Sequence, residues 1–295
     1  MRLLPALLLL LQSIITVHTE LVVVPAVVTD KTGRHVTGLR QEDFHIYEDG
    51  RLRPTEVFHH GDAPITLGLI VDRSASMRPK VAALLTAVSS LLESSRTEDE
   101  LFAVDFNDRV SFELPADHPF TSDAKVLEAA LLAPRAEGRT ALYDGVADGL
   151  QQLEAGHGQR HALIVISDGG DNASRRTYAD VLALARRSDA VIYAIGLTST
   201  SGDAEADDDE GLLKRLCKDT GGLAFFPRKL EEIASVAAQV ASDLHEQYTL
   251  GFSPAERTGR GAFRKIEVVV TQAGAGRPHV RTRPGYLSSA PGPKP

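Results

Sequence analysis

The sequence predicts an α/β fold with a mostly parallel, doubly wound sheet of the Rossmann-like type, and a small β-rich accessory region formed by both chain ends. Two observations predict it. Between Leu67 and about Glu246, short apolar runs alternate with segments of helical period, which is the pattern of strands joined by crossover helices. On either side of this core, strand-like stretches are separated by Gly and Asp turns, which is typical of short paired strands.

The core elements are predicted in order along the chain. An Asn107-Asp108 turn makes Val110–Leu114 an antiparallel edge strand. Apolar residues from Val81 to Leu92 recur at three- and four-residue steps, so this helix has one apolar face, and Pro79 suits its first turn. The buried strands are Leu67–Val71, Leu101–Phe106, Ala162–Ser167, Val191–Leu197 and Leu223–Phe226. Further helices are expected at Ala124–Leu132, Ala141–Leu153, Tyr178–Arg187, Glu210–Asp219 and Leu230–Glu246.

The flanking strands are expected to pair with one another. Because they lie on both sides of the core, they predict one β-rich domain made of both chain ends, and extension of the core sheet is the alternative. The predicted strands are Leu21–Thr29, Phe44–Tyr47, Leu52–Phe58, Tyr248–Phe252, Lys265–Thr271 and Arg277–Arg283. The expected divisions are residues 20–64, 65–246 and 247–288, followed by a Pro- and Gly-rich tail over 289–295.

The first 19 residues predict a secretory signal peptide, because a basic start precedes a short apolar run. That run is shorter than the roughly 20 apolar residues of a spanning helix. An uncleaved N-terminal anchor is the alternative, since no clean small-x-small triplet marks the cleavage site. We therefore expect a secreted, periplasmic or cell-envelope protein, with no membrane insertion beyond this segment.

The net charge argues against two classes of partner, and the cysteine count excludes an intrachain disulfide. The chain has 32 basic and 40 acidic residues and a net charge of −8, which argues against nucleic acid or an anionic membrane as the default partner. Cys217 is the single cysteine, so no intrachain disulfide can form. Its apolar helical surroundings favour a packed residue over a reactive thiol.

Three polar segments stand where a ligand site is expected in such a fold. Asp72-Arg73-Ser74-Ala75-Ser76 directly follows one buried strand, Ser167-Asp168-Gly169 ends another, and Thr140 stands at a loop-to-helix junction. Ligands of open α/β sheets sit at the carboxyl ends of the strands. Carboxylate and hydroxyl oxygens suit Mg²⁺, Mn²⁺ or Ca²⁺ rather than zinc or copper. The segments predict a divalent-cation site, and simple helix capping is the structural alternative.

Together these segments resemble the von Willebrand factor A domain and its metal-ion-dependent adhesion site. The match consists of a D-x-S-x-S run, a threonine in a G-x-T-A-L-Y-D-G-like loop and an aspartate in S-D-G-x-D-N, and it covers about residues 65–246. The flanks are similar to those of secreted bacterial proteins that carry this domain. The segments concerned are Val28–Gly33, Glu42–Gly50, Tyr248–Phe252 and Arg283–Tyr286.

The resemblance implies a role for each of five residues. The hydroxyls of Ser74, Ser76 and Thr140 would bind the metal directly, and Asp72 and Asp168 would hold it directly or through water. Neutral hydroxyls neutralise little of the ion's charge, so an octahedral ion keeps an electrophilic open position. A carboxylate of a partner protein would fill that position.

Two residues of these segments differ from the usual family motif, and further acidic residues lie near it in the sequence. Ala75 stands where the family usually has glycine, and Arg139 replaces a frequent glycine before the threonine; neither change removes a ligand oxygen. Asp144 and Asp171 are expected either to support the ligands or to be surface turn residues. The acidic tract from Asp203 to Glu210 is expected to be a solvated loop on the face of the site that also starts the next helix.

These observations favour an exported, non-enzymatic, adhesion-type module that binds Mg²⁺ (or Mn²⁺ or Ca²⁺) and an acidic residue of an unidentified protein partner. A Mg²⁺-dependent hydrolase or phosphatase is one alternative, because an aspartate at a strand end can be a nucleophile. Against it, Ser74 stands where such phosphatases have a second aspartate. A scaffold with a vestigial metal site is the other alternative.

Overall fold

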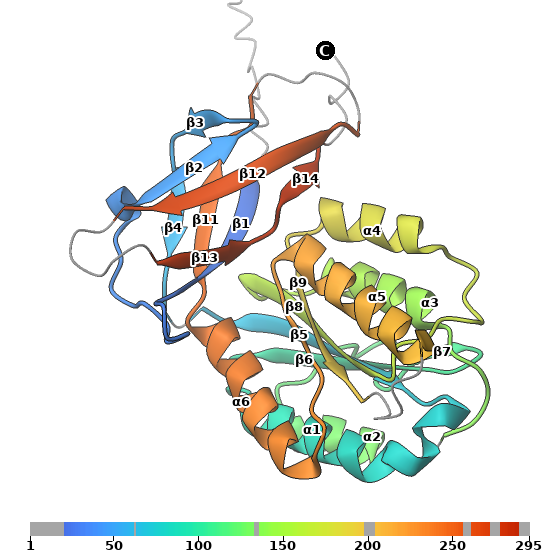
Figure 1. The fold of residues 1–295 in the computed structure, drawn as a ribbon. Coiled ribbons are helices and arrows are strands. Elements are labelled where there is room, and N and C mark those ends of the chain that lie inside the picture. Colours follow the sequence, from blue (N-terminus) through green and yellow to red (C-terminus); the bar gives the residue numbers. More distant parts are fainter. Residues whose placement is uncertain are drawn as a thin grey trace, which may run out of the picture.

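The computed structural model describes residues 21–61, 63–132, 136–197, 204–255, 261–271 and 278–288, and of 204–207 it describes the backbone only. The predicted signal peptide and tail lie outside these ranges. Figure 1 shows two lobes, a larger α/β lobe and a smaller β-sandwich packed against one end of its sheet. The fold class predicted from the sequence is therefore confirmed.

The α/β lobe is built on a six-stranded sheet in the order β10-β9-β8-β5-β6-β7. All of its pairs are parallel except β6 with β7, the predicted antiparallel edge strand. Each central strand is buried on both faces, which explains the continuous apolar runs. The strands are β5 (Ile65–Asp72), β6 (Glu100–Phe106), β7 (Val110–Phe112), β8 (Arg160–Ser167), β9 (Val191–Gly196) and β10 (Ala224–Phe225).

Helices cover both faces of this sheet. Leu69 packs in a core with α1 (Val81–Glu93), α2 (Ala124–Leu131) and α6 (Leu230–His245). Its neighbour Ile70 points to the other face and packs with α3 (Leu142–Leu153), α4 (Tyr178–Arg187) and α5 (Ala204–Thr220). A short 3₁₀ helix, η2 (Ala75–Lys80), contains Pro79, so this proline precedes α1 instead of standing in its first turn.

Helix α5 begins earlier than predicted. Residues from Ala204 to Glu210 are helical, so the expectation of a solvated loop is wrong for this part of the acidic tract. Acidic residues stabilise the first turns of a helix through its dipole, which explains how the tract becomes helical. Asp203 lies outside the described residues.

Cys217 is fully buried in α5, and burial raises the pKa of its thiol, as expected of a packed residue.

Both chain ends form the sandwich, as predicted, and do not extend the core sheet. Its antiparallel sheets have the orders β13-β1-β11-β4 and β14-β12-β2-β3. The predicted strand Leu52–Phe58 is in fact two strands in different sheets, because Pro54 lacks the N–H that pairing requires. Strand β14 was not predicted. The strands are β1 (Val22–Thr29), β2 (Phe44–Glu48, after the 3₁₀ helix η1, Gln41–Asp43), β3 (Arg51–Arg53), β4 (Val57–His59), β11 (Tyr248–Phe252), β12 (Phe263–Val270), β13 (His279–Thr282) and β14 (Gly285–Leu287).

Buried polar contacts join the two lobes. Asp243 near the end of α6 is paired with Nε2 of His35 at 2.8 Å and with the Arg281 guanidinium of β13. Arg160, at the start of β8, donates to the carbonyl oxygens of Leu244 in α6 and of Gln247 in the connection from α6 to β11, at 3.0 and 2.8 Å, and so holds the chain where it passes from one lobe to the other. Charged groups buried in this way are stable only when each has its partner.

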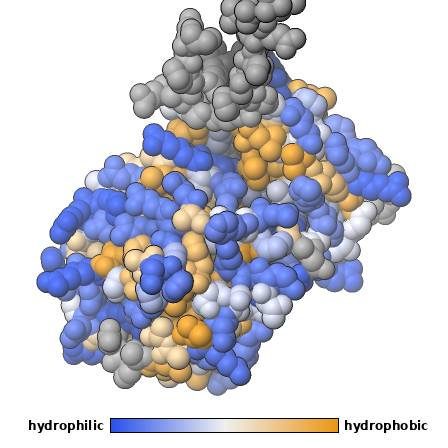
Figure 2. Space-filling model, turned by 180° about the vertical axis from the view of Figure 1, so that it is seen from behind, coloured by the Kyte–Doolittle hydropathy of each residue, from blue (hydrophilic) through white to orange (hydrophobic). Residues whose placement is uncertain are grey.

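The surface gives a first indication of how the lobes differ. Seen from behind, hydrophilic side chains cover most of the larger lobe, and the largest apolar group lies on the sandwich (Figure 2).

Within the described ranges, no helix combines the length and the apolar character that crossing a membrane requires.

Candidate metal centre

The predicted ligands lie where the strand order of the core sheet reverses. Asp72 ends β5, Asp168 directly follows β8, and these strands are neighbours. The chain leaves β5 through α1 toward β6, whereas it leaves β8 through α4 toward β9 on the opposite side. The two carboxyl ends therefore flank a topological switch point, which is where open α/β sheets bind ligands.

Asp72 is fully buried and held by hydrogen bonds to both carboxylate oxygens. The backbone N–H of Ser74 donates to Oδ1 at 2.8 Å, and the Ser167 hydroxyl donates to Oδ2 at 2.5 Å. The hydroxyl oxygens of Ser74 and Ser76 lie 3.0 Å apart. The predicted D-x-S-x-S run thus forms one compact group of oxygen atoms, and none of its side chains caps helix α1.

The electrostatics of Asp72 favour a cation. Burial raises the pKa of this carboxyl from 3.8 to about 6, against the lowering effect of the hydrogen bonds from Ser167 and Ser74, and the negative charge of Asp168 raises it further. The carboxylates of Asp72 and Asp168 are therefore close enough to repel one another, in a site largely shielded from water. A positive charge between them would relieve this repulsion.

The loop that carries Thr140 joins both of the other segments. The Ala75 N–H donates to the carbonyl of Gly138 at 3.1 Å, and the Thr140 N–H donates to the side-chain oxygen of Asn172 at 2.9 Å. Thr140 is 5% exposed. Gly138 has φ +81°, and a Cβ there would lie 2.1 Å from a carboxylate oxygen of Asp108, so the loop requires glycine at this position.

Asp168 has a cationic neighbour that the motif does not include. The Lys80 ammonium lies 2.8 Å from its Oδ2 atom, and the two side chains are 20% and 12% exposed. Lys80 is the last residue of η2, four residues after Ser76. The contact joins the turn after β5 to the loop after β8.

Neither departure from the family motif disturbs the loops. Ala75 does not adopt a positive φ, so the alanine is not strained. The Arg139 guanidinium turns to Asp108 on the β6–β7 hairpin, with its Nε 2.8 Å from Oδ1. Hydrogen bonds from the Arg139 side chain and N–H lower the pKa of Asp108, so this arginine has an acidic partner of its own.

Asp144 and Asp171 hold the loop after β8 against the start of α3. Asp171 accepts a hydrogen bond from the Tyr143 N–H at 3.1 Å, and Asp144 accepts one from the Arg175 N–H at 2.9 Å. Both carboxylates thus hold the loops of the site in place, and their predicted support of metal ligands stays a prediction. From the acidic tract, Asp209 lies against this loop, because a Cβ on Gly169 would come within 2.7 Å of the Asp209 Cβ.

The donor set fits a hard divalent cation that binds few charged ligands. Two carboxylates and three hydroxyl-bearing residues belong to the three joined segments, and sulfur and imidazole are absent from the predicted set. No cluster of three or more His, Cys, Asp or Glu side chains suited to a metal occurs in the described part of the chain. The hydroxyls would therefore have to complete any metal shell here.

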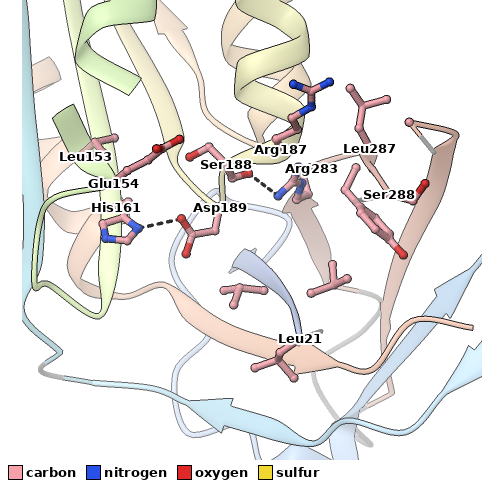
Figure 3. A pocket seen from close by; sticks show the side chains of 14 residues that line it. Leu21, Leu153, Glu154, His161, Arg187, Ser188, Asp189, Arg283, Leu287 and Ser288 are labelled. Atoms are coloured by element: carbon pink, nitrogen blue, oxygen red, sulfur yellow. Dashed lines mark hydrogen bonds and ion pairs between the residues drawn. The ribbon is translucent and has the colours of Figure 1, made fainter. Parts of the chain in front are cut away.

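A separate cavity of about 520 Å³ lies at the junction of the two lobes (Figure 3). His161 points to Asp189, with 2.7 Å between Nδ1 and Oδ1, and the Arg283 guanidinium donates to the Ser188 carbonyl at 2.7 Å. His161 stands at the amino end of β8 and Ser167 at its carboxyl end, roughly 20 Å apart. The cavity is therefore remote from the candidate metal centre.

Sequence reasoning missed three residues of this centre. Ser167 and Asn172 belong to the S-D-G-x-D-N segment, but the motif alone did not indicate that they bind Asp72 and Thr140. Lys80 gave no local signal, because its partner is 88 residues away. All three roles depend on the tertiary arrangement of the loops.

Residues 67–170 match the von Willebrand factor type A domain family, and this segment contains all five predicted ligands. No curated protein sequence matched the chain.

Solved structures share the fold at low sequence identity. A von Willebrand factor type A protein from Catenulispora acidiphila aligns with a TM-score of 0.52 and 13% identity over 84% of this chain and 74% of that one. The pilus adhesin SpaC from Lactobacillus rhamnosus GG, in an open conformation, gives 0.52 and 11% over 84% and 48%. Proximal thread matrix protein 1 from the mussel byssus gives 0.51 and 16% over 67% and 51%. The chain thus spans about half the length of the last two proteins.

Proposed function

We propose that this protein is an exported, non-enzymatic binding module that holds a divalent cation, Mg²⁺ or a similar ion, and uses it to bind an acidic side chain of a protein partner. Ser74, Ser76 and Thr140 would supply hydroxyl oxygens, and Asp72 and Asp168 would supply the negative charge. When bound, the ion supplies an electrophilic position for the partner's carboxylate.

The observation that carries the proposal is the arrangement around Asp72. A buried carboxylate, a second carboxylate and a pair of hydroxyl oxygens 3.0 Å apart meet at the switch point of the sheet. The three hydroxyls add no negative charge, and a carboxylate that holds the ion through water neutralises it only in part, which favours a further anionic ligand from outside. The likeness to a pilus adhesin, a surface protein by its name, supports an adhesive role for an exported chain.

The same geometry argues against a nucleophilic role for Asp72. Both of its oxygens accept hydrogen bonds and the residue is completely buried, so its carboxylate is not presented to a substrate. A phosphatase nucleophile must reach the phosphorus atom. The hydrolase alternative therefore receives no support from this site.

Recovery of a partner tests the proposed function. Immobilised wild-type protein is incubated with an envelope extract in Mg²⁺, in EDTA, and after Mg²⁺ is restored. We expect a protein that is retained in Mg²⁺, released by EDTA and retained again on restoration, and that an Asp72→Ala column does not hold. Retention that is the same on both columns and insensitive to EDTA contradicts the proposal.

Metal affinity is expected to depend on pH. Because the pKa of Asp72 is raised to about 6, a proton competes with the cation for this carboxylate below that pH. The apparent affinity for Mg²⁺ should change little above about pH 7 and should fall about fivefold between pH 6 and pH 5. Titration calorimetry across this range measures it. An affinity that is unchanged down to pH 5 would show that this carboxylate is not a ligand.

A further inference from the structure

We infer that Lys80 is a built-in competitor of the metal: its ammonium occupies Asp168 in the metal-free protein and sets the cation concentration at which the site fills. The inference rests on the proposed function, since it concerns the regulation of the same site. Its basis is a direct contact of 2.8 Å between Nζ and the Oδ2 atom of a predicted ligand.

Lys80 differs from the other cationic side chains on these loops. The guanidinium of Arg73 is bound to Asp105, that of Arg78 donates to the Ala136 carbonyl, and that of Arg139 is bound to Asp108. Among the described residues, Lys80 is thus the basic side chain whose charge contacts a predicted metal ligand.

The position of Lys80 does not suit a purely structural role in helix α1. It stands between the C-terminal end of η2, which favours a cation, and the N-terminal end of α1, which disfavours one, and the first turn of α1 contains no acidic residue. The charge is instead compensated across the site, by Asp168. Both side chains are mostly shielded from solvent, so their attraction is screened only weakly.

The Lys80 ammonium and a metal ion repel one another when both contact the Asp168 carboxylate. A divalent cation held by Asp168, directly or through water, would lie within a few ångströms of the ammonium and repel it. The flexible stem of lysine allows the ammonium to move away into solvent, and no packed element has to shift. The metal therefore has to displace a cation already in place, which lowers its apparent affinity and stabilises the metal-free protein.

The test compares Lys80→Met with Arg78→Met, which removes a cation from the same turn that does not contact a predicted ligand. Mn²⁺ binding is measured by titration calorimetry, and the melting temperature is measured in EDTA and in saturating Mn²⁺. We expect Lys80→Met to bind Mn²⁺ at least about tenfold more tightly than wild type. In EDTA it should melt at a lower temperature than wild type, and Mn²⁺ should raise its melting temperature by more than it raises that of wild type. Arg78→Met should bind like wild type.

The outcomes separate this inference from the proposed function. If wild type binds Mn²⁺ and Lys80→Met binds equally or more weakly, the inference is wrong and the metal site stands. An equal loss of melting temperature in EDTA and in Mn²⁺ would make the contact an ordinary salt bridge, and would also overturn it. If neither protein binds Mn²⁺, the proposed function itself fails. Binding by Lys80→Met alone would support the competition and would show that the wild-type site is closed by its lysine.

Discussion

Replacing Asp72 by alanine is expected to weaken Mg²⁺ and Mn²⁺ binding by at least about 100-fold. The substitution removes a buried negative charge that the cation would neutralise. It also removes the acceptor for the Ser74 N–H and the Ser167 hydroxyl, so the turn after β5 loses the contacts that orient its hydroxyls.

Titration calorimetry against wild type measures this loss. Asp117→Ala is the matched control, because the Asp117 side chain is 79% exposed and belongs to no segment of the site. Circular dichroism of each variant separates loss of binding from loss of the fold, and Asp72→Asn, which removes the charge and keeps the size, provides a second comparison. Equal metal uptake by wild type and folded Asp72→Ala would refute the assignment of the site.

Replacing Asp243 by alanine is expected to lower the free energy of unfolding by about 3 to 5 kcal/mol. Asp243 is the shared partner of His35 and Arg281 at the junction of the lobes, and the Arg281 side chain is 15% exposed. Without Asp243, the Arg281 guanidinium remains charged at a site that is largely inaccessible to water. Its remaining contacts, such as the Gly221 carbonyl, are uncharged.

Urea unfolding followed by circular dichroism measures this effect. Glu42→Ala is the control, because it breaks the exposed pair with Arg40, whose side chains are 80% and 69% exposed, and exposed pairs contribute only about 0 to 1 kcal/mol. A loss below 1 kcal/mol in Asp243→Ala would show that the junction does not depend on this carboxylate.

The core of the fold was predictable because its signals are local. A strand buried on both faces, such as β8, is a run of apolar residues, and an amphipathic helix such as α1 repeats its apolar positions every three to four residues. Two of the differences arose at prolines. Pro54 divides a continuous β-like stretch into β3 and β4, and Pro284 separates β14 from β13.

The candidate site was predictable to the extent that its residues are close in sequence. Asp72, Ser74 and Ser76 lie within five residues, and their spacing at a strand end already indicates a common ligand. Lys80 could not be assigned in this way. Its role depends on which carboxylate the turn after β5 meets, and that follows from β5 and β8 being neighbours in the sheet.

The most direct test of the metal site is a crystal of the wild-type protein grown with Mn²⁺ and measured at the manganese absorption edge. The proposal predicts one strong anomalous peak within bonding distance of the hydroxyl oxygens of Ser74, Ser76 and Thr140, beside the carboxylates of Asp72 and Asp168, and absent from Asp72→Ala crystals. A wild-type crystal without a peak there, or with Mn²⁺ bound only elsewhere, would contradict it.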